Sequence, residues 1–165
     1  MLISFQSIHQ GCCHVLRNVQ LTFKSKLAVP AEQSWQWAIS VDGISTELRP
    51  LLKMTVPHHV KSLLGLEVRL GQRLFRSWLL LFGVIPIDRS DLTLVELDPG
   101  RRFIEQSPML SMRLWRHERI VRAVVGGSTI TDRLEFQPRF NKRLTRWFIK
   151  KLFTHRHAVL RRSLG

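Results

Sequence analysis

The stretch that decides the fold is MRLWRHERIVRAVVGGSTITDRLEFQ, residues 112–137, in which two long strand-like segments flank the pair Gly126-Gly127. Such pairs form tight turns between antiparallel strands. Upstream, from residue 74 on, segments rich in Leu, Phe, Trp and Val are separated by Gly83, Pro86 and the turn-forming Asp98-Pro99-Gly100. Because these hairpins follow one another along the chain, we expect an antiparallel sheet.

The remaining elements follow from residue spacing. Val19 to Val29 alternates apolar and polar residues, which predicts a half-buried strand. Pro30 then opens a short helix over 31–38, and we expect Asp42-Gly43 to end it. Residues 51–56 fit either a short helix or a strand. Further strands are expected at 66–70, 74–84, 92–97, 102–107, 112–125 and 129–137.

A long amphipathic helix is expected from Asn141, which suits the capping position, to about Leu160. The apolar side that should pack on the sheet holds Leu144, Trp147, Phe148, Leu152 and Val159. On the same helical wheel His155 falls at the edge of the apolar stripe, and His157 falls among the basic residues. One helix covering the sheet makes an α+β domain with room for an apolar cavity between the two layers.

We expect this domain to span residues 19–165. A chain of 165 residues is long enough to bury a core without disulfides or metal. Residues 1–18 are mildly apolar but lack the features of a secretory signal. They are expected to form an N-terminal leader that is poorly ordered or loosely packed.

Several short phrases carry a resemblance to a known superfamily. They are LFRSW (74–78), LFGVIPID (81–88), WRHER (115–119), TDR (131–133) and FTHRH (153–157). Together with the order of elements, they resemble the START-like, helix-grip superfamily (SRPBCC) of ligand-binding and polyketide-cyclase-like bacterial proteins. The resemblance implies a curved antiparallel sheet of about six to seven strands wrapped around the C-terminal helix, with short helices after the first strand.

The resemblance also implies a binding scaffold that needs no cofactor. We expect a small apolar or amphipathic molecule, lipid-like or polyketide-like, to bind between sheet and C-terminal helix. The residues expected to contact it are Trp78, Leu80, Phe82, Arg113, Trp115, Arg119, Phe148 and Leu152. The alternative is a cyclase or dehydratase that acts in the same cavity, with His117, Asp132 and Glu105 as the candidate catalytic residues.

Asp132 shares its strand face with the apolar residues at the other even positions from 130 to 136, which predicts an inward-facing carboxylate. A buried carboxylate needs a partner, and Arg113, His117 or Arg119 could supply it. The pair would then be a structural ion pair, a polar anchor for a ligand carbonyl or hydroxyl, or part of an acid–base site. The pattern of residues 112–120 leaves open whether His117 or Glu118 faces the cavity.

Positive charge is concentrated at the C-terminal end. The chain has a formal net charge of +14, and residues 101–165 alone hold 16 Lys/Arg against 4 Asp/Glu. Basic residues gather on one side of the last helix, and those expected to meet an anion are Lys142, Arg143, Arg146 and Lys150. This face is either simply solvated or a binding surface for an anionic membrane or nucleic acid.

Other classes of function lack their sequence signals. Cys12 and Cys13 are adjacent, which fits neither a disulfide framework nor a zinc site, so we expect no metal and a reducing cytoplasm. The sequence contains no nucleophile elbow, phosphate-binding glycine loop or dinucleotide fingerprint. The most apolar run, residues 78–87, is far shorter than the roughly 20 residues of a membrane-spanning helix, so no transmembrane span is expected.

Overall fold

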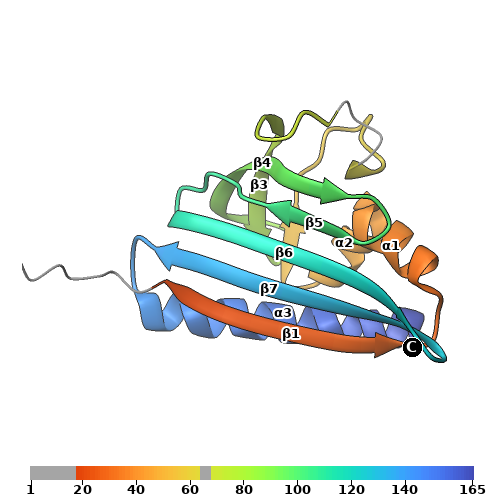
Figure 1. Ribbon diagram of the computed structural model, residues 1–165. Helices are drawn as coiled ribbons and strands as arrows, with labels where there is room; N and C mark the ends of the chain where they lie inside the picture. The colour runs from red at the N-terminus through yellow and green to blue at the C-terminus, as the bar shows by residue number, and fades with distance from the viewer. Residues whose placement is uncertain (1–17, 64–67) are drawn as a thin grey trace, which may run out of the picture.

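The computed structural model describes residues 18–63 and 68–165, and Figure 1 shows a curved sheet with one long helix lying along it. Within those ranges the elements are β1 (Val19–Leu27), α1 (Ala31–Ile39), α2 (Val41–Leu48), β2 (Leu52–Met54), β3 (Arg73–Leu81), β4 (Ile85–Asp98), β5 (Arg102–Glu105), β6 (Met112–Val124), β7 (Gly127–Pro138) and α3 (Lys142–Leu164). The strands form one seven-stranded sheet in the order β1-β7-β6-β5-β4-β3-β2, and every neighbouring pair is antiparallel. The predicted α+β helix-grip architecture is confirmed.

One local prediction is wrong. Asp42-Gly43 does not end helical structure, because it lies in the first turn of α2, where the Gly43 amide donates to the side chain of the capping residue Ser40. A Cβ on Gly43 would lie only 2.3 Å from the Trp37 carbonyl oxygen. The glycine therefore allows α1 and α2 to approach closely rather than breaking the helix. The ambiguous segment 51–56 contains strand β2.

Two expectations fall wholly or partly outside the described residues. Of the expected leader, only Asn18 is described. Residues 66 and 67 of the strand expected at 66–70 also lie outside, and residues 68–70 are not a strand. The chain reaches β3 from the α2–β2 region through residues 55–72, whose described part holds no strand or α-helix.

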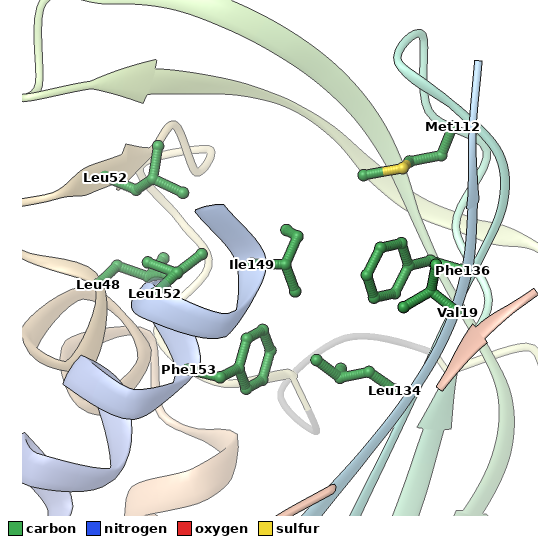
Figure 2. Packing of buried hydrophobic residues seen from close by; sticks show 9 residues of the cluster. All are labelled: Val19, Leu48, Leu52, Met112, Leu134, Phe136, Ile149, Leu152 and Phe153. Atoms are coloured by element: carbon green, nitrogen blue, oxygen red, sulfur yellow. The ribbon is translucent and has the colours of Figure 1, made fainter. Parts of the chain in front are cut away.

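The core lies between the sheet and α3. Figure 2 shows one cluster in which side chains of the sheet face side chains of α3 and of the α2–β2 segment; it comprises Val19, Leu48, Leu52, Met112, Leu134, Phe136, Ile149, Leu152 and Phe153. A second cluster, which includes Leu27, Trp35, Ile130 and Leu160, closes the end of the sheet near the C-terminus of α3. Full burial of each Leu, Ile or Phe side chain contributes about 1.5–3 kcal/mol, so these clusters fix α3 against the strands.

The face of α3 that packs on the sheet matches the predicted one in part: Leu152 and Val159 are buried as expected. Leu144 and Trp147 are 59% and 57% exposed, whereas Ile149, Phe153 and Leu160 are buried. The pattern was misleading because the buried side also carries two charged or polar residues, Arg156 and His157, which a hydropathy reading assigns to solvent. In the described part of the chain, no helix is both long and apolar enough to cross a membrane.

Candidate functional site

A cavity of about 500 Å³ lies between the sheet and α3. Its mainly apolar wall includes Leu48, Leu52, Met54, Leu79, Leu81, Met112, Trp115, Phe148 and Leu152. Small-molecule sites typically measure about 300–1,000 Å³ and have this apolar character. Ile87 of β4 and Leu144 and Trp147 of α3 line the same cavity although they are exposed, so they mark its opening.

Behind one wall of the cavity lies a group of polar side chains that we call the buried charge cluster. It comprises Glu47, His117, Arg119, Asp132, Arg156 and His157, none of which is more than 7% exposed. These residues come from α2, β6, β7 and α3, so the cluster joins both layers of the fold. Burial of so many ionisable groups is tolerated only when each is paired.

Glu47 of α2 is the acceptor for both arginines. Arg119 donates to its carboxylate from Nη1 at 3.0 Å and from Nη2 at 2.8 Å, and Arg156 donates from Nε at 3.0 Å and from Nη2 at 2.8 Å. The indole of Trp37 adds a hydrogen bond of 3.1 Å. Burial alone would raise the pKa of Glu47, but the two guanidinium groups outweigh it and lower that pKa.

Asp132 of β7 is the second acceptor. Arg119 donates to it from Nε at 2.7 Å and from Nη2 at 2.8 Å, while Nε2 of His117 and Nε2 of His157 lie 3.0 and 3.1 Å from its oxygens. Because an ionised carboxylate only accepts hydrogen bonds, both imidazoles donate through Nε2. The Ser25 hydroxyl lies 2.8 Å from Nδ1 of His157. Burial opposes ionisation, yet Arg119 and His117 hold the pKa of Asp132 well below its usual value.

His117 connects this cluster with Glu105 of β5. Its Nδ1 lies 3.6 Å from the Glu105 carboxylate, which also accepts a hydrogen bond of 2.6 Å from Ser107. Burial lowers the pKa of His117, but Asp132 and Glu105 outweigh it and raise that pKa above the ordinary value. Burial likewise raises the pKa of Glu105, and His117 outweighs it and lowers that pKa. The favoured state is therefore an imidazolium between two carboxylates.

Two members of the buried charge cluster, His117 and Arg156, line the cavity, and so does the neighbouring Glu105. Nε and Nη2 of Arg156 are engaged with Glu47, so Nη1 is the part of the guanidinium that has no hydrogen-bond partner among the described residues. The guanidinium carbon lies 4.7 Å from the centre of the Phe153 ring, a cation–π contact that stabilises the position of the group. The cavity thus has a polar end formed by a guanidinium, an imidazole and a carboxylate, while Asp88, Ser90 and Ser111 form a separate polar part of its lining.

The structure brings some predicted site residues to the cavity and leaves others away from it. Trp115, Phe148 and Leu152 line it, as do the catalytic candidates His117 and Glu105. Asp132 and Arg119 are fully buried in the charge cluster behind the wall. Arg113 is exposed and is not part of the lining. Glu118 lies on the other side of β6, where it binds Arg102 and Arg133.

The predictions for β3 are wrong by one residue. Trp78, Leu80 and Phe82 were expected to line the cavity, but Leu79 and Leu81 do so instead. Because strand side chains alternate between faces, a one-residue error exchanges the whole set. The run from Trp78 to Phe82 is entirely apolar, so its sequence contains no alternation from which the inward face could be read.

Of the two C-terminal histidines, His155 lies at the core edge with a hydrogen-bond partner as expected, whereas the expectation that His157 lies among the basic residues is wrong. His157 is buried between Asp132 and Ser25, whereas His155 lies at the helix edge with Nε2 2.6 Å from the Arg49 carbonyl oxygen. The residues that sequence reasoning missed are Glu47 and Arg156, whose partnership spans 109 positions. No acidic residue follows Glu135, so the sequence of α3 contains no local partner that would indicate which of its arginines is paired.

Metal binding finds no support in the geometry. Among residues 18–63 and 68–165, no three His, Cys, Asp or Glu side chains are arranged to hold a metal ion. The expected anion-binding residues Lys142, Arg143, Arg146 and Lys150 are all exposed on the first half of α3.

Comparison with protein families now adds to this geometry. The family model described as Domain of unknown function (DUF8410) matches residues 25–164. The protein belongs to this family. Comparison with curated proteins gives no match to the sequence of this DUF8410 protein.

Solved structures with the same fold are distant in sequence. The Zhui aromatase/cyclase from Streptomyces sp. R1128 has a TM-score of 0.64 at 12% identity, covering 87% of this chain and 92% of that one. Protein CV1439 from Chromobacterium violaceum has a TM-score of 0.63 at 14% identity, with coverage of 86% and 96%. Ara h 8.0201 has a TM-score of 0.56 at 11% identity, with coverage of 87% and 97%. These similarities confirm the helix-grip, SRPBCC-like fold.

Proposed function

We propose that this DUF8410 protein binds a small amphipathic molecule, lipid-like or polyketide-like, in the cavity between the sheet and α3. The observation that carries the proposal is a mainly apolar cavity of about 500 Å³ with a polar end that includes Nη1 of Arg156. The apolar body of the ligand would lie among Leu48, Leu52 and Phe148. Each buried CH₂ group would contribute about 0.8 kcal/mol to binding.

The polar end defines the chemistry of the ligand. Nη1 of Arg156 is the donor left free at the cavity wall, so the matching ligand group is an acceptor such as a carbonyl, phenol or hydroxyl oxygen. Glu47, Asp132 and Glu105 balance Arg119, Arg156 and protonated His117 in charge. A neutral acceptor on the ligand therefore fits this end of the cavity better than a ligand carboxylate, which would add an unbalanced negative charge.

Nile red, a neutral fluorescent probe with an apolar ring system and a carbonyl acceptor, tests this proposal. The probe should bind the wild-type protein and gain fluorescence. Leu79→Trp places a larger ring in the cavity and should weaken probe binding by at least about tenfold. Leu80→Trp is the matched control, because the same change on the opposite face of β3 leaves the cavity unchanged. Equal probe affinity in both variants would contradict binding in the cavity.

Catalysis of cyclisation or dehydration is the second candidate, because Glu105 and His117 converge on the same wall of the cavity. Glu105 would accept a proton from a carbon beside a carbonyl group, and Nη1 of Arg156 would donate a hydrogen bond to the oxygen of the enolate that forms. Deuterium exchange at the central carbon of acetylacetone, followed by NMR, measures this first step. The wild-type protein should accelerate the exchange and Glu105→Gln should not. A wild-type rate equal to that in buffer would remove this candidate.

A further inference from the structure

We propose that the opening of the cavity docks on an anionic lipid surface, so that the cavity faces the membrane. The proposal goes beyond ligand binding, because it concerns the outer surface around the opening rather than the cavity interior. It rests on two features that occur together at this end of the molecule: exposed apolar side chains and a surrounding excess of positive charge.

The apolar feature is a set of six side chains that we call the opening patch. It comprises Phe82, Val84 and Ile85 at the tip of the β3–β4 hairpin, and Phe140, Leu144 and Trp147 around the start of α3; each is between 53% and 75% exposed. The two groups belong to one opening, because Leu81 and Ile87 beside the hairpin tip line the same cavity as Leu144 and Trp147. Exposed apolar side chains gathered around the opening of a cavity usually mark an interaction site.

Phe82, the aromatic residue at the hairpin tip, has a backbone conformation that is unfavourable for a bulky side chain. Phe82 has φ of 51°, in the left-handed region where glycine or asparagine is favoured over a bulky side chain. Gly83, which follows, has φ of 79° and allows the turn. A phenylalanine held in this conformation and still exposed is not explained by packing, whereas insertion into a membrane interface gives it an environment suited to an aromatic ring.

Positive charge borders the patch on both sides. Lys142, Arg143, Arg146 and Lys150 are exposed on α3, and no Asp or Glu occurs after Glu135. On the hairpin side, a Cβ on Gly83 would lie 3.9 Å from the Lys53 side chain, so this lysine lies next to the tip. Near an anionic membrane surface, each such cation contributes about 1 kcal/mol.

The combination favours a membrane over nucleic acid. Nucleic acid binding without sequence preference uses aromatic rings for base stacking inside a basic groove. Here three of the six patch residues, Val84, Ile85 and Leu144, are aliphatic and lie at the tip of a projecting hairpin or at the edge of an apolar cavity. Aliphatic and aromatic side chains ringed by Lys and Arg are the composition of surfaces that enter the interfacial region of a bilayer.

Co-sedimentation of the purified protein with vesicles tests the proposal. The protein should bind vesicles of equimolar phosphatidylcholine and phosphatidylglycerol, and should bind pure phosphatidylcholine much more weakly. The double variant Val84→Ser/Phe140→Ser, which leaves the cavity lining intact, should lower the affinity at least about tenfold because it removes two insertable side chains. Arg143→Gln/Arg146→Gln should lower it about thirtyfold, from about 1 kcal/mol for each charge.

The matched control is Arg101→Gln/Arg122→Gln, which makes the same change of charge on exposed residues at the opposite end of the sheet. Its vesicle affinity should stay close to that of the wild-type protein. An equal loss in this control would show that only net charge matters and would overturn the proposal. It would also be overturned if the wild-type protein bound single-stranded oligonucleotides but not anionic vesicles.

Discussion

The two ends of the cavity differ in the side chains that they place in and out of water. At the inner end, six ionisable side chains are removed from water, and their carboxylates, guanidinium groups and imidazoles are bound to one another. At the opening, apolar side chains that would fit a core remain exposed. Placing charges inside and apolar groups outside is unfavourable for a protein that only needs to fold. The contrast therefore points to a site that recognises molecules with a polar group and an apolar body.

The two ends also differ in how firmly their side chains are held in place. Every side-chain N or O atom that is fully buried in the described residues has a hydrogen-bond partner, and Nη1 of Arg156 is left to face the cavity, so the inner end has a fixed arrangement. The opening patch has no such network to hold it. Changes at the inner end should therefore alter stability strongly, and changes at the opening should alter interactions while leaving stability nearly constant.

Replacement of Glu47 should have the largest effect on stability. Glu47→Gln leaves Arg119 and Arg156 buried without this carboxylate, and loss of one partner of a buried ion pair typically lowers the free energy of unfolding by about 3–5 kcal/mol. Urea denaturation measures the change. Glu32→Gln, in the exposed first turn of α1, should stay within about 0.5 kcal/mol of the wild-type value. Similar values for the two variants would show that the cluster contributes little.

Arg156→Lys should have an intermediate effect that extends to the ligand. Lysine keeps the charge but cannot reproduce the two donors to Glu47 together with a third toward the cavity, so we expect a stability loss of about 1–3 kcal/mol. Affinity for Nile red should fall as well. Arg162→Lys, on an exposed arginine of the same helix, should change neither property. Undiminished probe binding by the Arg156 variant would remove this residue from the site.

His117 should give the inner end a pH dependence. Its pKa is raised in the folded protein, so its contribution to stability is complete below the unfolded value of about 6.5 and is lost as the pH rises through the folded value. The wild-type protein should therefore lose stability relative to His117→Gln as the pH rises above about 6.5. Urea denaturation of both proteins across this range measures the difference. A constant difference would mean that His117 is not held protonated by Asp132 and Glu105.

The smallest stability effect is expected at the opening. Val84→Ser removes an apolar side chain that is 74% exposed and has little packing to lose, so the free energy of unfolding should change by no more than about 0.5 kcal/mol. Thermal denaturation gives the value. A loss comparable to that of Glu47→Gln would show that the hairpin tip is part of the folding core and would remove the contrast between the two ends.

Much of the fold was readable from local signals. Gly126-Gly127 marks the β6–β7 turn, and Asn141 caps α3 by accepting a hydrogen bond from the Leu144 amide. Both signals act within four residues, so a single sequence contains them. Strand β4 begins earlier than the expected residue 92, because its first half is held by pairing with β3 and by Asp88, which accepts hydrogen bonds from the Leu110 and Ser111 amides.

The site was only partly readable, for a physical reason. The alternation on β7 predicted that Asp132 faces inward, and Arg119 and His117 were among its expected partners. Glu47 lies 72 positions from Arg119 and 109 from Arg156, and no local pattern distinguishes these partners from solvent-exposed charges. The interior charges on α3 also shifted the predicted apolar face, which is why Trp147 was expected in the core.

Native mass spectrometry of protein purified directly from cells tests the central claim most directly, because a molecule bound in the cavity adds its own mass to the intact protein. Wild-type protein and the Leu80→Trp control should both carry a copurifying molecule that contains an acceptor oxygen and an apolar body. Leu79→Trp should carry none. The account would be contradicted if Leu79→Trp retained the same added mass, or if the wild-type protein bound neither a cellular molecule nor the fluorescent probe.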